Sequence, residues 1–134
     1  GGWDCELDVV AFHPGSAHLI HIEPSMDTNS WAERERRYAV KFAAGRKYIP
    51  AMFKGLQVPK KIEQVALFGY ASKKNHPTIC GGEVKLVSEL LEEITSSLRH
   101  KKIANAAVSE QYPILRTIQF MCEHGDVLVK QSGN

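Results

Sequence analysis

Two short apolar stretches near the start of the chain are separated by a turn. Residues 5–12 are rich in Val, Leu and Phe, and residues 18–23 alternate Leu and Ile with polar side chains. Both patterns are typical of β-strands. Residues 14–17, Pro-Gly-Ser-Ala, have the composition of a tight loop. The pattern therefore predicts a β-hairpin at the start of the fold.

A helical pattern follows this hairpin. Ser30 and Glu33 have the spacing of a capping box, which predicts a helix over residues 31–44 that ends at Gly45. Residues 46–57, which contain a proline, are then expected to form a connector. One face of the helix carries the apolar side chains that we expect to pack on a sheet: Trp31, Tyr38 and Phe42.

The remainder of the chain predicts one more buried strand and two more helices. Residues 62–71 form a nearly continuous apolar run, which is typical of a strand buried on both faces in a parallel or mixed sheet. Amphipathic periodicity predicts helices over residues 83–99 and 113–123. Between these helices, residues 103–108 are expected to form a short edge strand, and residues 127–134 are expected to form a frayed tail.

Together these elements predict an α/β fold with a mixed central sheet flanked by helices. The 134 residues are enough to bury a sizeable core, so we expect a single domain over residues 1–134. The chain begins with Gly1-Gly2 rather than Met, and its first strand follows almost at once. We therefore interpret it as a fragment of a larger protein, with any recognition domain outside this sequence.

Composition narrows the cellular context more than the function. The net charge of +2 is too small to indicate a nucleic-acid partner by itself. Cys5, Cys80 and Cys122 form no C-x-x-C pair, which argues against a disulfide framework and favours a reducing cytoplasm. The sequence shows no signal peptide and no apolar run long enough to cross a bilayer, so we expect no membrane contact.

The register of the hairpin carries the first candidate chemistry. If His13 and His18 close the loop, Asp8 faces Glu23, and His21 lies on the same face of the strand pair. Opposed carboxylates repel each other and need a compensating charge, for which a divalent cation is one source. The alternatives are a register shifted by one residue, or two carboxylates that are solvated on an exposed face.

The same hairpin resembles an element of a known nuclease superfamily. Asp8-Val9-Val10-Ala11, followed after a short loop by Ile22-Glu23-Pro24-Ser25, is similar to the core hairpin of the PD-(D/E)xK superfamily, which includes many restriction enzymes and Holliday-junction resolvases. Asp8 matches the first metal-binding acid of that motif, and Glu23 matches the acid of its E-x-K element. Ser25 stands where the superfamily usually has Lys.

This resemblance implies a restriction-endonuclease-like core and Mg²⁺-dependent hydrolysis of DNA phosphodiester bonds, with Mn²⁺ able to substitute. The expected protein is an endonuclease, the cleavage module of a restriction-like enzyme, with DNA as its partner. Asp8 and Glu23 would hold the metal ion, which activates water and offsets charge on the phosphate. Lys41, on the predicted helix, is the candidate replacement for the missing motif lysine, because its flexible stem could reach the carboxylates.

Other residues have supporting roles in this interpretation. Glu6 and Ser25, which face each other in the expected register, and His21 are candidates to orient the metal ligands or a water molecule. Arg34 and Arg37 share a face of the predicted helix with the candidate lysine, and we expect them to contact the DNA backbone. The alternative is a solvated face balanced by neighbouring glutamates.

A second hypothesis is that the protein has the same nuclease-like fold but does not hydrolyse DNA. Ser25 would then mark a degenerate nuclease domain that binds nucleic acid or a partner subunit without cutting. A homodimer, or a recognition domain outside this chain, is compatible with either hypothesis. Metal-dependent nicking of plasmid DNA distinguishes the two.

Overall fold

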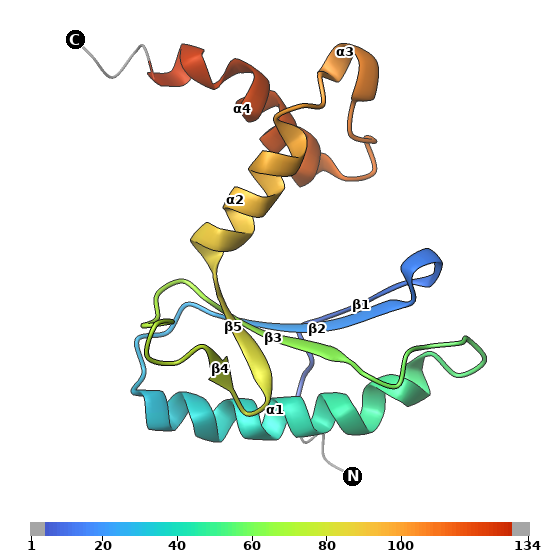
Figure 1. Ribbon diagram of the computed structural model, residues 1–134, viewed down its shortest axis with the longest axis vertical. Coiled ribbons are helices and arrows are strands. Elements are labelled where there is room, and N and C mark those ends of the chain that lie inside the picture. Colours follow the sequence, from blue (N-terminus) through green and yellow to red (C-terminus); the bar gives the residue numbers. More distant parts are fainter. Residues whose placement is uncertain (1–4, 130–134) are drawn as a thin grey trace. The chain divides into compact units, whose positions relative to one another are not determined.

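The chain forms two compact units, residues 1–87 and residues 88–134, in a computed structural model that describes residues 5–129. The prediction that residues 1–134 act as one domain stays a prediction. The first unit contains a sheet and one long helix (Figure 1): β1 (Val9–His13), β2 (His18–Ser25), α1 (Trp31–Met52), β3 (Glu63–Phe68), β4 (Thr78–Ile79) and β5 (Gly82–Leu86).

The sheet has five strands in the order β1-β2-β3-β5-β4. Its three central strands, β2, β3 and β5, run parallel, while β1 and β4 pair antiparallel at the two edges. Because β2 and β3 are parallel, the chain must cross over between them, and α1 lies in that crossover. The predicted mixed α/β fold is thus confirmed, and the restriction-endonuclease-like core stays a prediction.

The β1–β2 hairpin has the predicted register. Val10 pairs with His21, and His13 pairs with His18 next to the loop. The loop itself is a single 3-10 turn, Pro14–Ser16. This register places His21 and Glu23 on the face of the sheet that α1 covers, where both side chains are buried.

The first strand is shorter than the apolar pattern predicted. It begins at Val9, so the expected pairs of Asp8 with Glu23 and of Glu6 with Ser25 lie beyond the strand ladder. Asp8 nevertheless stays beside Glu23, because its backbone N–H donates a hydrogen bond of 3.1 Å to Glu23 Oε1. The segment before β1 is therefore held by the side chain of Glu23 and not by backbone pairing with a strand.

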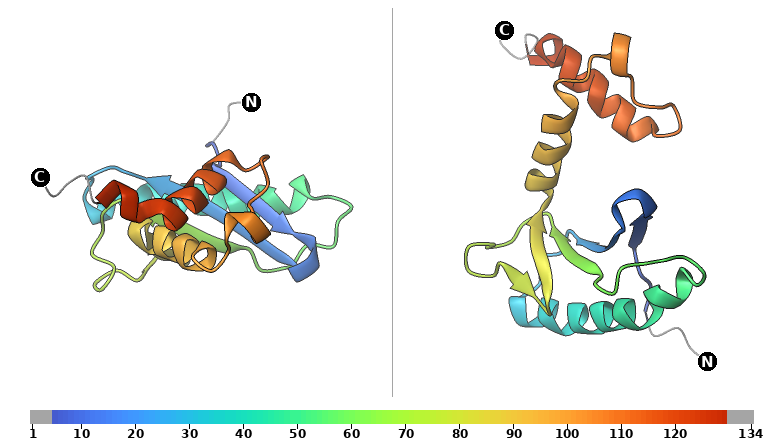
Figure 2. Two further views of the ribbon diagram at one scale, coloured as in Figure 1. Left: turned by 90° about the horizontal axis from the view of Figure 1, so that it is seen from above. Right: turned by 45° about the vertical axis from the view of Figure 1, so that its right-hand side comes forward.

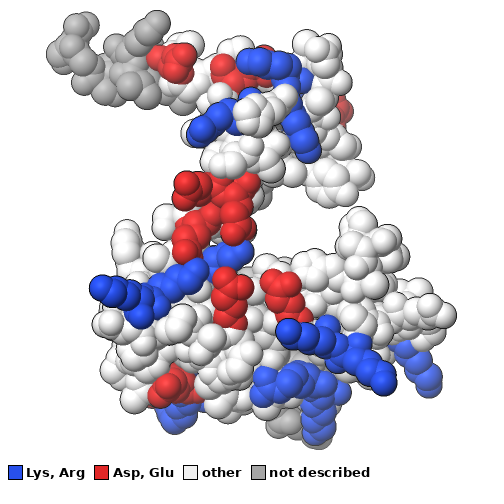
Figure 3. Space-filling model, in the orientation of Figure 1, with Lys and Arg blue, Asp and Glu red and all other residues white. Residues whose placement is uncertain are grey.

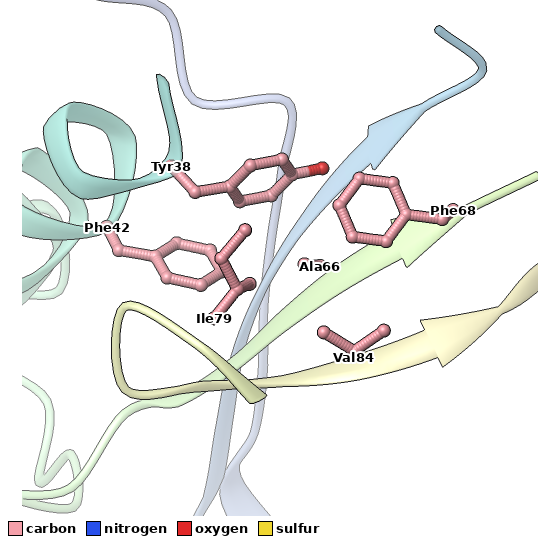
Figure 4. Packing of buried hydrophobic residues seen from close by; sticks show 6 residues of the cluster. All are labelled: Tyr38, Phe42, Ala66, Phe68, Ile79 and Val84. Atoms are coloured by element: carbon pink, nitrogen blue, oxygen red, sulfur yellow. The ribbon is translucent and has the colours of Figure 1, made fainter. Parts of the chain in front are cut away.

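Helix α1 covers one face of the sheet, as two further views of the ribbon show (Figure 2). It begins where the capping pattern predicted, with Ser30 Oγ accepting a hydrogen bond of 3.3 Å from the N–H of Glu33. Fully burying a large apolar side chain contributes roughly 1.5–3 kcal/mol, so its inner face stabilises the unit strongly. The core cluster joins this face to three strands (Figure 4): Tyr38, Phe42, Ala66, Phe68, Ile79 and Val84.

Helix α1 does not end at Gly45 as predicted, but continues to Met52. Gly45 is buried, and a Cβ atom there would lie 2.4 Å from His21 Nδ1 and 3.0 Å from Gln64 Nε2. Glycine is therefore needed for close approach of the helix to the sheet, and not as a helix stop. Pro50 is tolerated because its missing N–H affects only the end of the helix.

The helix predicted over residues 83–99 is wrong at its start. Residues 82–86 form β5, and α2 spans Val87–Leu98. Val84 is fully buried in the core cluster, and β5 pairs with β3 on one side and with the two-residue strand β4 on the other. Strand pairing over a long sequence distance therefore overrides the helical periodicity of this short segment.

The second unit is helical and contains α2, α3 (Ile103–Ala106) and α4 (Pro113–Val129). The expectation of an edge strand over residues 103–108 is wrong, because α3 occupies this segment. The backbone groups of this segment form hydrogen bonds with the side chain of Gln119 in α4 and not with a strand. Gln119 is 1% exposed. Gln119 bonds two of these groups, Ala106 C=O and Val108 N–H, and also Lys101 C=O just before the segment.

Helix α4 is longer than predicted and extends to Val129. A glycine inside a helix costs only about 1 kcal/mol, so Gly125 does not end it. Of the tail expected over residues 127–134, the first three residues are helical and the last five lie outside the described residues. Among residues 5–129, no helix combines the length and apolar character that crossing a membrane requires.

Replacing Gly45 by Ala should destabilise the first unit. The added methyl group meets buried His21 and Gln64, which are held by hydrogen bonds and cannot easily move away. Overpacking of this kind costs about 1–3 kcal/mol. The free energy of unfolding, measured by denaturant titration with tryptophan fluorescence, should fall by this amount, because Trp31 packs against the core of this unit.

The matched control is Gly125→Ala, which makes the same substitution inside α4. A Cβ atom at Gly125 has no heavy atom within 4 Å, so this variant should be as stable as the wild type or more stable by up to about 1 kcal/mol. Similar small effects of the two substitutions would contradict the close packing of α1 on β2.

Candidate active site

Three charged side chains from different parts of the first unit meet at one point. Asp8 precedes β1, Glu23 lies in β2 and Lys41 lies in α1. Lys41 Nζ is 3.0 Å from Asp8 Oδ2 and also donates a hydrogen bond to Glu23 Oε2. The structure therefore brings together the two acids predicted to bind a metal ion and the lysine predicted to replace the motif lysine. The charge that compensates the two acids is an ammonium group.

The side chain of Glu23 is buried, with 1% of its surface exposed. Besides Lys41, it accepts hydrogen bonds from the N–H of Asp8 at 3.1 Å and from His21 Nε2 at 2.8 Å. Burial alone raises the pKa of Glu23, but the hydrogen bonds from His21, Asp8 and Lys41 outweigh it and lower the pKa to about 2. Glu23 is therefore ionised at neutral pH, as a metal ligand must be.

Asp8 has a more open environment, with 33% of its side chain exposed. The neighbouring Glu23 and partial burial raise the pKa of Asp8, against the opposing effect of Lys41. Burial lowers the pKa of Lys41, but its hydrogen bonds to Glu23 and Asp8 outweigh this effect and raise it. On acidification Asp8 therefore takes up a proton before Glu23, while Lys41 stays charged.

A chain of hydrogen bonds runs from Arg46 at the surface to buried Glu23. Arg46 Nη1 donates to Gln64 Oε1 at 2.6 Å, which leaves the amide nitrogen of Gln64 to donate to Phe42 O at 2.9 Å and to His21 Nδ1 at 3.1 Å. With Nδ1 as an acceptor, the neutral His21 ring carries its proton on Nε2 and donates it to Glu23. His21 therefore orients the carboxylate.

A second charged cluster forms around Asp27, in the turn after β2. Ser25 Oγ donates a hydrogen bond to it, Arg37 Nη1 lies 2.7 Å from Oδ2, and Arg34 Nε lies 3.2 Å from Oδ1. The hydrogen bond from Ser25 outweighs burial and lowers the pKa of Asp27 to about 2. Ser25 therefore donates its hydrogen bond to Asp27 and not to Asp8 or Glu23, the ligands of the predicted metal site.

Arg34 is not on a solvent-facing stripe, as the helical spacing had suggested. Its side chain is 8% exposed, and it donates to the carbonyl groups of Asp27 at 2.7 Å and Tyr70 at 3.2 Å. Its guanidinium group also lies 4.5 Å from the centre of the Phe68 ring. Arg34 therefore has a structural role, and its expected contact with DNA stays a prediction, whereas Arg37 is 46% exposed.

Glu6 is exposed in the segment before β1, beyond the ladder that would have paired it with Ser25. Three residues that organise the site escaped sequence reasoning: Arg46, Gln64 and Asp27. The only signal for Gln64 is a polar residue inside an otherwise apolar strand. Asp27 resembles an ordinary turn residue until the fold brings two arginines to it.

The acids at this site fit a magnesium ion. Mg²⁺ commonly takes one or two protein carboxylates and completes its shell with water and substrate phosphate oxygens. Asp8 and Glu23 form such a pair, and Asp8 is open to solvent. No group of three or more His, Cys, Asp or Glu side chains within residues 5–129 could hold a metal ion by itself. An ion at this pair would therefore need further ligands from solvent or substrate.

Comparisons of the chain with models of known protein families, with curated proteins and with solved structures found no match. A functional assignment therefore depends on the site: a buried ionised glutamate, a partly exposed aspartate and a lysine, held on a mixed α/β unit.

Replacing Glu23 by Gln should destabilise the protein at neutral pH, because the new amide nitrogen would face the Lys41 ammonium group as a second donor. The pKa of Glu23 in the fold, about 2, lies below its ordinary value of 4.5. Glu23 therefore stabilises the fold fully above pH 4.5 and loses this contribution as the pH falls toward 2. The difference in the free energy of unfolding between wild type and variant should shrink in this window.

In the wild type, Asp8 has a raised pKa, chiefly because of Glu23, so its own contribution changes above its ordinary value of 3.8 and that of Glu23 changes mainly below it. Asp27 also has a lowered pKa, but it is present in both proteins and cancels in the difference. Denaturant titrations at a series of pH values give the result, and a difference that does not change with pH would contradict an ionised, hydrogen-bonded Glu23.

Proposed function

We propose that the first unit is a Mg²⁺-dependent DNA endonuclease of the PD-(D/E)xK type, the cleavage module of a restriction-like enzyme. The observation that carries this proposal is the convergence of Asp8, Glu23 and Lys41 from three separate elements of a mixed α/β fold. Metal-assisted hydrolysis of a phosphodiester bond uses a bound metal ion and a positive charge near the phosphate, and these residues could provide the ligands for the first and supply the second.

Each residue of the site has a defined role in this proposal. Asp8 and Glu23 hold the metal ion, with Mn²⁺ able to replace Mg²⁺. When bound, the ion polarises the phosphate and lowers the pKa of a coordinated water molecule. His21 and Gln64 keep Glu23 ionised and oriented. Lys41 places a positive charge beside the carboxylates, where it stabilises negative charge that develops on the phosphate.

Lys41 supports the idea of a relocated lysine. The usual motif position holds Ser25, which carries no charge and whose hydroxyl group donates to Asp27. Stabilisation of the phosphate depends on where an ammonium group lies in space, and Lys41 reaches both carboxylates from α1. Its side chain is 25% exposed, which leaves its charge accessible from solvent.

DNA is the proposed substrate and partner. Arg37 lies about one turn before Lys41 on α1 and is 46% exposed, so we assign it a contact with the phosphate backbone. The recognised sequence would be read by a domain outside this chain or by a second copy of it. Three free cysteine side chains are consistent with the proposed cytoplasmic location: Cys5, Cys80 and Cys122.

The alternative function is a nucleic-acid- or partner-binding module with a degenerate nuclease fold. One observation favours it: Lys41 already pairs with Asp8 and Glu23, so the two acids are compensated without a metal ion. In that case the three side chains would only fix the hairpin on α1. Removing Lys41 would then lower stability, and there would be no activity to lose.

The protein should nick supercoiled plasmid DNA in the presence of Mg²⁺ or Mn²⁺, and it should not do so when EDTA removes the ion. With saturating DNA and a single turnover, Lys41→Ala should lower the cleavage rate by about 100-fold or more, because an interaction of the transition state is lost. Its DNA affinity should change little. Gel quantification of nicked plasmid gives the rate, and fluorescence anisotropy gives the affinity.

Lys47→Ala is the matched control for this experiment. Lys47 lies on the same helix, but its ammonium group is 4.8 Å from the centre of the Tyr48 ring. This variant should cut at the wild-type rate. Cleavage by Lys41→Ala at the wild-type rate would exclude Lys41 as the catalytic cation, and DNA binding by the wild type without metal-dependent nicking would support the alternative function.

Mg²⁺ or Mn²⁺ should also raise the melting temperature of the wild type, because the ion binds the native state. At an ion concentration about 100 times the dissociation constant, the expected stabilisation is about 2.7 kcal/mol. Glu23→Gln should show a much smaller shift in the same thermal scan, since one ligand is lost. Equal shifts for both proteins would mean that the ions bind elsewhere.

A further inference from the structure

Two large side chains are open to solvent where the parallel strands of the sheet end. Tyr70, two residues after β3, is 85% exposed, and Met26, directly after β2, is 64% exposed. The loops that carry them touch: the N–H of Gly69 donates to Ser25 O at 3.2 Å, and a Cβ atom on Gly69 would lie 2.7 Å from Met26 Sδ. The carboxyl ends of parallel strands are a common place for ligands.

Buried Arg34 fixes both loops before any ligand arrives. Its guanidinium group donates to the carbonyl of Tyr70 in one loop and to the carbonyl of Asp27 in the other. It also lies over the Phe68 ring at the end of β3. Because the backbone beside Tyr70 is already held, little ordering cost remains for binding at this place. An exposed aromatic ring on a fixed backbone points to a binding role.

The surroundings of these loops are basic. Asp27 is shared by two arginines, so one negative charge faces two positive charges and the cluster has a net charge of +1. The loop between β3 and β4 adds Lys73 and Lys74, with Glu83 lying 3.9 Å from the first of them. Figure 3 shows Lys and Arg side chains gathered over this loop, at the left of the first unit. Exposed aromatic rings among cations are the usual surface for single-stranded nucleic acid, with bases on the rings and phosphates on the cations.

We propose that Tyr70 and Met26 form a stacking platform for an unpaired base of the DNA strand that is cut at Asp8, Glu23 and Lys41. This inference rests on the proposed nuclease function and names its substrate class. The preferred substrate is DNA that is single-stranded next to the scissile phosphate, because a base inside a duplex has no free face for the ring of Tyr70.

Helix α1 connects the platform to the site. Arg34, which holds the Tyr70 loop, is seven residues before Lys41, which is about 10 Å along the helix axis. Arg37 lies between the two places and is exposed, so it is positioned for an intervening phosphate.

The test measures DNA binding in EDTA, so that it does not depend on cleavage. Fluorescence anisotropy compares a single-stranded oligonucleotide with a duplex of the same length for the wild type, Tyr70→Ala and Tyr70→Phe. The wild type should bind the single strand more tightly. Tyr70→Ala should lose roughly ten-fold or more in affinity for the single strand, and Tyr70→Phe should keep it because the ring remains. The salt dependence should be unchanged, since no phosphate contact is removed.

The matched control is Tyr112→Ala in the second unit, where Tyr112 is 55% exposed. It should bind both DNA forms as the wild type does. The inference is overturned if Tyr70→Ala binds the single strand as tightly as the wild type, or if the wild type prefers the duplex. It is also overturned if Tyr70→Ala changes the oligomeric state in size-exclusion chromatography, because a second copy would then cover the ring. Tyr70-dependent binding by a protein that never nicks DNA would support the platform and overturn the nuclease.

Discussion

A buried carboxylate that stays ionised constrains the packing of the first unit. Glu23 is almost fully enclosed, and an unpaired charge in such a place costs several kcal/mol. Its donors come from the segment before β1, from β2 and from α1: the N–H of Asp8, His21 Nε2 and Lys41 Nζ. The segment that leads into β1 and the helix α1 therefore both form hydrogen bonds with the two carboxylate oxygen atoms of Glu23. The candidate site and the packing of the hairpin on the helix are one arrangement.

The same constraint explains the polar residues around it. Gln64 on the neighbouring strand donates to His21 Nδ1, and this hydrogen bond favours the neutral ring form in which Nε2 carries the proton and donates it to Glu23. Gly45 leaves the space that the imidazole ring occupies under the helix. Tyr38, in the core, donates to the backbone carbonyl of Glu23 at 2.8 Å. In the described part of the chain, every fully buried side-chain nitrogen and oxygen atom has a hydrogen-bond partner, so no buried polar side chain bears the cost of an unsatisfied group.

Helix α1 carries both a buried cation and partly exposed ones. Arg34 is used inside the fold to join two loops, while Arg37 and Lys41 keep exposed surface. The helix thus separates a structural cation from cations that remain available to a ligand. Since a fold does not imply a function, this division of roles is the physical basis for the proposed nuclease and for its proposed preference for unpaired DNA.

The sequence over a few neighbouring residues was sufficient to predict part of this fold. A two-residue alternation and a tight loop set the register of the hairpin, and Ser30 set the start of α1, because strands and helix caps obey rules that act over a few residues. The same register, together with the resemblance to the nuclease motif, indicated Asp8 and Glu23 as the acids of the site. The length of its side chain indicated that Lys41 could reach them. The tertiary structure decided what depends on distant segments. Gly45 stands where a helix stop was predicted, yet its role is to allow a close approach of α1 to β2. The residues after Gly82 have a helical pattern, yet they form a strand that pairs with β3. Gln64 and Asp27 become part of the charged network only when strands and helix meet, because a hydrogen-bond partner many residues away leaves no periodic signal in the chain.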